Sequence, residues 1–118
     1  MSDDWVTCVA IRGERVLAGT YTGGLLERRG GRFVRALDPQ RFAVRGVAFL
    51  PGSGRAVAAT PLGVYAETAS GWAPLPARLC GGLEAQAVLP AASGVWVGSR
   101  TGLAYVPLSA RRGLSASR

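Results

Sequence analysis

The chain has 118 residues, and 48% of them are hydrophobic, which is enough apolar material for one globular unit with a buried core. Its basic residues are 14 arginines against seven acidic residues, so the net charge is +7, and the absence of histidine excludes the ordinary histidine-based catalytic relays and zinc sites. No stretch approaches the roughly 18 uninterrupted apolar residues of a membrane span, and the first five residues, MSDDW, lack the basic and apolar segments of a signal peptide, which predicts a cytoplasmic protein.

A short motif occurs three times in the chain, at a spacing of 40 and then 39 residues. Its copies read VLAGTYTGGLL, AVAATPLGVYA and VWVGSRTGLAYV and start at Val16, Ala56 and Val95. Two positions of the motif align in all three copies: Gly23, Gly63 and Gly102, and Thr20, Thr60 and Ser99. A repeat of this length that is made only of short strands is typical of the blades of a β-propeller.

The first repeat predicts four strands, at about residues 6–11, 16–20, 24–28 and 32–37, of which the first would be the innermost. Cys8 lies in the first of them, within an apolar run, and is expected to act as a small core side chain. The last two strands carry a cluster of arginines: Arg28, Arg29, Arg32 and Arg35. We expect this cluster to be solvated on an outer hairpin, where charge blocks edge-to-edge pairing, and a polyanion site and a protein-binding patch are its alternatives.

The second repeat predicts strands at about 46–50, 56–60, 64–68 and 71–75, and the third predicts strands at about 85–89, 95–99 and 103–108 without a convincing fourth. One position of the second strand is always small, namely Gly19, Ala59 and Gly98, which suits close packing between neighbouring blades. The predicted fold class is therefore all-β, a partial propeller over residues 1–108 with three four-stranded antiparallel blades, the third incomplete, at about 5–40, 43–78 and 84–108. The basic segment 109–118 is expected to be a disordered tail.

Three blades cannot close into a ring, and propellers usually close with about 4 to 8 blades. The first and third blades would then expose apolar faces that another chain has to cover. We expect a homodimer that forms a six-bladed ring, with the edge of the third blade completed by the segment around Trp5 of the other copy. A hetero-complex in which a partner chain supplies the missing blades is the second solution, and a fragment of a longer propeller is the third.

The strand pairs VLAGTYTGGL, from Val16, and VWVGSRTGL, from Val95, resemble the repeats of bacterial propellers of the two-component-regulator and sialidase-repeat type. This resemblance covers the chain from about Trp5 to Val106, and it implies a blade architecture without implying an activity. The Asp-box of sialidase repeats, Ser-x-Asp-x-Gly-x-x-Trp, is not preserved: the glycine is kept in ERRGGRF and ETASGW, but the aspartate is missing.

Catalytic and cofactor chemistry has little support in this sequence. The chain has only seven carboxylates, and Glu27 and Glu67 fall on equivalent repeat positions, where we expect them to be solvated outer-strand residues and not a catalytic pair. The two cysteines are expected to be reduced, with Cys80 in a linker as the candidate for a reactive or metal-associated thiol. The glycine pairs lack the lysine and the helix of a phosphate-binding loop. We predict a protein that is not an enzyme and that holds no cofactor and no metal.

Exposed aromatic and basic side chains are the remaining candidates for a binding site. Tyr21 lies in a turn, Trp72 lies in the outer half of the second blade, and Arg100 replaces Tyr21 in the third repeat, so these three are our candidate ligand-binding residues. Trp96 lies in a second strand and is expected to be in the core.

Two functions from different classes remain open. The first is a protein-interaction or scaffold subunit of a bacterial complex, with itself or another protein as its partner. The second is a lectin-like propeller that binds a glycan or a small ligand between its blades. Nucleic acid is an unfavoured partner because the arginines are spread along the chain, and no membrane association is predicted.

Overall fold

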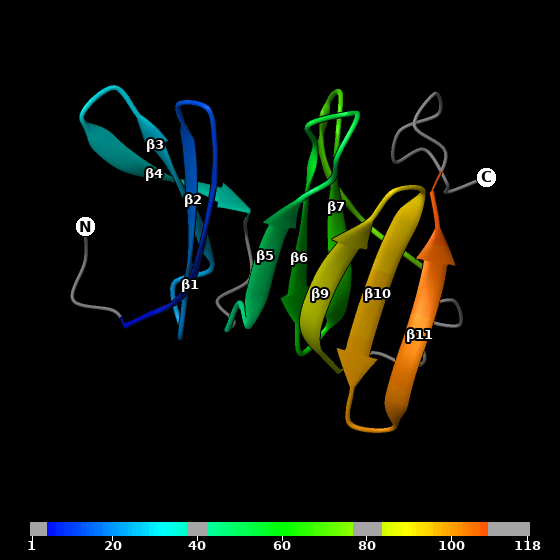
Figure 1. Cartoon of the computed structure of the whole chain (residues 1–118). Coiled ribbons are helices and arrows are strands. Elements are labelled where there is room, and N and C mark those ends of the chain that lie inside the picture. The colour runs from blue at the N-terminus through cyan, green and yellow to red at the C-terminus, as the bar shows by residue number, and fades with distance from the viewer. Residues whose placement is uncertain (1–4, 38–42, 77–83, 109–118) are drawn as a thin grey trace.

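The computed structural model describes residues 5–37, 43–76 and 84–108, and the regular elements of these segments are all β-strands (Figure 1). They form three antiparallel sheets with four, four and three strands, as the repeats predict. The first sheet has the order β1-β2-β3-β4, with β1 (Val6–Arg12), β2 (Arg15–Thr20), β3 (Leu25–Arg29) and β4 (Arg32–Leu37). The second sheet has the order β5-β6-β7-β8, with β5 (Gly46–Phe49), β6 (Ala56–Thr60), β7 (Gly63–Thr68) and β8 (Gly71–Pro74). The third sheet has the order β9-β10-β11, with β9 (Ala85–Ala91), β10 (Gly94–Ser99) and β11 (Gly102–Pro107).

The described segments contain no helix, and therefore none that is long and apolar enough to cross a membrane. The predicted tail at 109–118, the linker with Cys80 and the linker after the first sheet lie outside the described residues.

The second sheet is packed between the other two sheets. All five residues of β6 are buried, and successive side chains of a strand point to opposite faces. Ala56 and Ala58 join a core cluster with Leu17 of the first sheet, whereas Val57 and Ala59 join a cluster with side chains of the third sheet. Both faces of β6 are thus covered by a neighbouring sheet.

The sheets approach one another most closely at their first strands. The β5 backbone lies against β1 on one side and against β9 on the other, while the outer strands of neighbouring sheets stand farther apart (Figure 1). The apolar run that begins each repeat is therefore the strand at which the sheets converge, as the sequence predicts.

Gly19 shows why a small residue is needed on the second strand. A Cβ atom built on Gly19 would come within 2.7 Å of the Val44 Cγ1 atom and would also collide with the Cys8 thiol. Cys8 itself is half-buried and packs against the same core cluster, as expected, and this burial raises the pKa of its thiol.

The turn between the second and third strands corrects the predicted repeat alignment. In the first sheet the Thr20 hydroxyl donates to the Gly24 carbonyl at 2.7 Å, and in the second sheet the Thr60 hydroxyl donates to the Gly63 carbonyl at 2.8 Å. Gly24, with a positive φ of 80°, is therefore the counterpart of Gly63, and the predicted equivalence of Gly23 is wrong. The first turn holds one additional residue.

That additional residue reverses which face each later side chain of β3 occupies, because side chains alternate along a strand. Glu27 pairs with Leu17 and faces the second sheet, whereas Glu67 lies next to Ala66, the partner of Val57, and faces the first sheet. Glu27 and Glu67 are therefore not equivalent, and they approach each other from opposite sides of one interface.

We predict that Gly19→Ala lowers the free energy of unfolding by about 1–3 kcal/mol, because the added methyl group overpacks the contact with Val44. Gly98→Ala is the matched control, since its Cβ would meet only the Ala87 Cβ at 3.8 Å, an ordinary contact, and the change should stay within about 1 kcal/mol. Urea unfolding of both variants measures the difference. Equal losses in the two variants would contradict the close approach at Gly19.

Candidate functional site

One arginine joins the first and second sheets. The Arg15 guanidinium donates to Glu27 in its own sheet at 2.8 Å through Nε, and to Glu67 of the second sheet at 2.9 Å through Nη2. Its Cζ atom also lies 5.2 Å from the centre of the Phe49 ring, a cation–π contact. The Glu67 carboxylate accepts a further hydrogen bond from the Ala56 backbone N–H at 3.1 Å. We call Arg15, Glu27 and Glu67 the inter-sheet clamp.

The clamp binds two acidic side chains of this basic protein between the first and second sheets. The hydrogen bonds that Arg15 donates to Glu27 and then to Glu67 raise the pKa of Arg15 further above its ordinary value. Glu27 is only 7% exposed, so the expectation that it is solvated is wrong. Because one guanidinium binds both carboxylates, this pair of acids holds two sheets together.

The third sheet has one face that no part of the described chain covers. Leu89, Trp96 and Tyr105 lie directly opposite one another on β9, β10 and β11, and Gly98 lies opposite Leu103. Leu103 is 71% exposed and Leu89 is 64% exposed. Trp96 contacts Tyr105 with the two rings tilted and their centroids 5.0 Å apart, yet it is 39% exposed, so the prediction that Trp96 is a core residue is wrong. We call this surface the open face of the third sheet.

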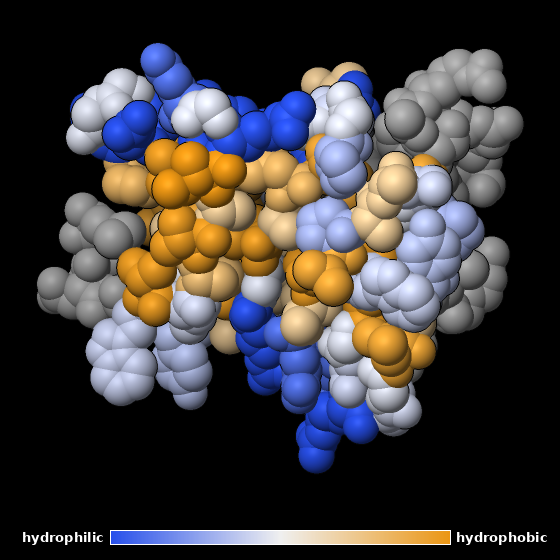
Figure 2. Space-filling view, viewed as in Figure 1, coloured by the Kyte–Doolittle hydropathy of each residue, from blue (hydrophilic) through white to orange (hydrophobic). Residues whose placement is uncertain are grey.

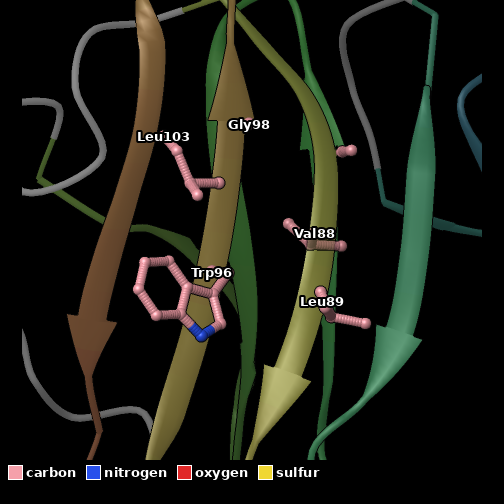
Figure 3. Close-up of a pocket in the computed structure, with 6 residues that line it drawn as sticks. Val88, Leu89, Trp96, Gly98 and Leu103 are labelled. Atoms are coloured by element: carbon pink, nitrogen blue, oxygen red, sulfur yellow. The ribbon is translucent and has the colours of Figure 1, made fainter.

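The open face of the third sheet is hollowed. A depression of about 300 Å³ lies between Leu89 on β9, Trp96 on β10 and Leu103 on β11 (Figure 3). The remaining lining residues are Ala87, Val88 and Gly98. A hollow without a charged lining residue suits apolar side chains of a partner rather than the hydroxyl groups of a sugar.

The first sheet has an open face as well, on the side that points away from the second sheet. Val9 and Ile11 on β1 are 55% and 67% exposed. Leu26 on β3 shares this face, because it pairs with Ala18, and Ala18 pairs with Val9. The outer strands add positive charge to this face, since Arg28 lies opposite Phe33 and Arg35 lies opposite Leu26.

The two open faces differ in charge. The face of the first sheet carries Arg28 and Arg35, both exposed, whereas the described residues on the face of the third sheet carry no charge. Figure 2 shows hydrophobic surface over β1, hydrophobic patches among pale blue residues over β9–β11, and hydrophilic surface toward both ends of the strands. The predicted arginine cluster at Arg28, Arg29, Arg32 and Arg35 is exposed on the β3–β4 hairpin, as expected.

The three predicted ligand-binding residues lie apart. Tyr21 follows β2, is 58% exposed and contacts Trp5 at a ring-centroid distance of 6.2 Å. Arg100 occupies the corresponding turn of the third sheet and pairs with Glu84 at 3.3 Å. Trp72 is half-buried on β8, next to the turn at the opposite end of its sheet, and packs against a core cluster. Tyr21 and Arg100 thus share an end of the strands but belong to separate turns, and Trp72 joins neither.

The sequence predicts that the first and third sheets expose apolar faces, but it does not identify the residues that form them. Among the residues that the structure describes, no three His, Cys, Asp or Glu side chains gather in a way that could hold a metal ion. Cys80, the other predicted reactive residue, lies outside the described segments.

Comparison with known proteins gives a likeness in fold alone. No protein-family model matches the chain, and no match is found among curated proteins. Among solved structures, the chain is similar to the crystal structure of the computationally designed Ika4 protein, with a TM-score of 0.53 and 11% sequence identity over 92% of this chain and 94% of that chain. The arrangement of strands described above therefore has a counterpart in an experimental structure.

We predict that Arg15→Ala lowers the free energy of unfolding by about 1–3 kcal/mol, because the buried Glu27 carboxylate loses two hydrogen bonds from Arg15 and keeps the longer ion pair with Arg29, at 3.7 Å. Adding Glu27→Gln should restore part of this loss, since a buried neutral amide costs less than a buried carboxylate that has lost its two shortest hydrogen bonds. Arg100→Ala, which breaks an ion pair between two exposed side chains, is the control and should cost less than about 0.5 kcal/mol. Chemical denaturation of the four proteins tests the clamp, and a loss at Arg15 no larger than at Arg100 would rule it out.

Proposed function

We propose that this protein is a non-enzymatic protein-interaction or scaffold subunit, built as part of a β-propeller of the two-component-regulator and sialidase-repeat type. Three sheets that pack face to face and converge at their first strands support this architecture. In a propeller each sheet is covered on both faces by its neighbours in the ring. The second sheet already has this environment.

The single observation that carries the proposal is the pair of open apolar faces on the first and third sheets. Ile11 and Leu103, which lie on these two faces, are each about two-thirds exposed or more, at 67% and 71%. Contiguous apolar surface of this kind marks a protein–protein contact more often than a solvated surface. A second chain could pack one of its sheets on each open face, and both outer sheets would then be covered on both sides like the second sheet. That chain is either a second copy or a different protein.

The lectin-like alternative has weaker support. Its candidate residues Tyr21, Trp72 and Arg100 belong to separate places on the molecule, and the hollow between Leu89, Trp96 and Leu103 is apolar. A sugar site needs hydrogen-bonding groups beside its aromatic platform. We therefore favour a protein as the occupant of the open faces.

Light scattering coupled to size-exclusion chromatography tests the proposal on the purified chain. We expect a mass near twice that of the 12.2 kDa monomer, and we expect Trp96→Glu to lower it toward the monomer mass, because a carboxylate would be desolvated in the contact. Tyr21→Glu is the matched control, since Tyr21 is an exposed aromatic residue outside both open faces, and it should leave the mass unchanged. A monomer whose mass and stability do not respond to Trp96→Glu would rule out a second copy as the occupant and leave a different protein, whereas saturable glycan binding that is lost in Tyr21→Ala or Trp72→Ala would contradict the proposal.

A further inference from the structure

We propose that the open face of the third sheet binds the open face of the first sheet in a second copy of this chain, with Arg28 of one copy against Tyr105 of the other. This inference rests on the proposed function and specifies its partner. Two such contacts, related by a twofold axis, would join two chains head to tail into a closed ring of six sheets.

The first argument is that each open face corresponds to a face that is buried inside the chain. Leu17 and Val57 occupy the same position of the repeat as Trp96, and each of the two packs against the sheet that follows it in the chain. Trp96 points the same way, but no described sheet follows. The open face of the third sheet is thus the surface that receives the next sheet.

The same correspondence holds on the other side. Ala56 and Val95 each pack against the preceding sheet, and Val16 is their counterpart in the first sheet. Val16 and its neighbour Ile11 belong to the open face of the first sheet, which no described sheet precedes. The two open faces are therefore the two halves of one type of interface.

The second argument comes from the residues that take the places of the inter-sheet clamp. Register pairs Leu17 with Glu27 and Trp96 with Tyr105, so Tyr105 stands where the clamp has Glu27. Arg28 stands in the first sheet where Glu67 stands in the second, because the longer turn shifts β3 by one residue. The third member is replaced by Gly94, which begins β10 as Arg15 begins β2.

At the proposed contact, the arginine comes from the sheet on the other side of the interface than in the clamp. Inside the chain, the arginine comes from the sheet that precedes the interface and a carboxylate comes from the sheet that follows it. At the proposed contact, the third sheet of one copy has Gly94 in the place of the arginine, and the first sheet of the other copy provides Arg28. The clamp and the proposed contact would then each contain one arginine.

The structure leaves an aromatic surface where this arginine would lie. A Cβ atom on Gly94 would meet the Tyr105 hydroxyl at 2.6 Å, so the phenol ring covers the space that Arg15 occupies in the clamp. The ring packs at a tilt against Trp96 and remains 39% exposed. A guanidinium on such a pair gains a cation–π contact, as Arg15 does on Phe49 within the chain, and the phenol hydroxyl can accept its hydrogen bond.

Charge also selects this pairing over a symmetric contact between two first sheets. Two first sheets packed on each other would bring Arg28 and Arg35 against the same residues of the second copy, which is unfavourable. The described residues on the face of the third sheet are uncharged and thus impose no such repulsion on Arg28. The first sheet of a second copy can therefore pack on the third sheet without repulsion between like charges.

Two charge variants test the contact in the full chain. We expect Arg28→Glu to weaken the dimer about 10-fold, through loss of the cation–π contact, and Tyr105→Arg to weaken it about 100-fold, through opposition to Arg28. Tyr105→Glu removes the same ring but restores the acid of the clamp, so it should keep the dimer. Circular dichroism and urea unfolding of each variant ensure that a loss of mass reflects assembly and not folding.

Mixing provides the decisive measurement. When Arg28→Glu chains are mixed with Tyr105→Arg chains, one contact of the mixed dimer is native, and the other places the introduced glutamate of one copy against the introduced arginine of the other. Native mass spectrometry should therefore show a heterodimer in excess over both homodimers. If the wild-type chain dimerises but the mixture forms no heterodimer, the head-to-tail contact is wrong while the proposed function stands. If the wild-type chain stays monomeric and Trp96→Glu changes nothing, the contact with a second copy is wrong and the proposed function requires a different protein; the proposed function itself fails if the chain instead binds a glycan through Tyr21 or Trp72.

Discussion

The packing of the second sheet between two others is the constraint on which the rest of the structure depends. Five consecutive residues of β6 are buried, which is possible only when sheets cover both faces of the strand. Its side chains are alanine, valine and threonine, and Gly19 on β2 leaves room for Val44. Small residues allow the backbones to approach at the inner strands, and the wider spacing farther out then admits longer side chains.

The clamp of Arg15, Glu27 and Glu67 follows from that geometry. Away from the inner strands the sheets diverge, and the space between them admits longer side chains that reach across. An arginine fits because its planar guanidinium can bind two carboxylates and lie on Phe49 at once. A lysine has no comparable planar surface. Hydrophobic packing near the inner strands and a charged contact farther out therefore stabilise one interface together.

The strands could be predicted from the sequence because each repeat carries its own turn residues and its own alternation of side chains. The face of the sheet that each side chain occupies could not be predicted equally well. Alignment by glycines paired Gly23 with Gly63, but the hydroxyl of Thr20 binds Gly24, and one residue decides the direction of every side chain on β3. Glu27 and Glu67 were consequently expected to be equivalent and solvated. Trp96 illustrates a second limit, because a strand that is apolar on both faces is typical of one buried between two sheets, and β10 has this pattern. Val95 and Val97 are indeed buried against the second sheet, but the pattern does not state whether the cover on the other face comes from the same chain.

The differences between the repeats consequently carry more information about function than their similarities. Shared residues such as Thr20 and Thr60 close turns and build each sheet, so they would be needed in any assembly of these sheets. Residues that differ at corresponding positions include Arg15, which lies where the first sheet meets the second, and Gly94, which lies on the open face of the third sheet. If all interfaces of the proposed ring were internal to one chain, nothing would set the first and last sheets apart. Their divergence, with arginine on one open face and aromatic rings on the other, is what a contact between two separate chains requires, because it distinguishes the correct neighbour from an identical face.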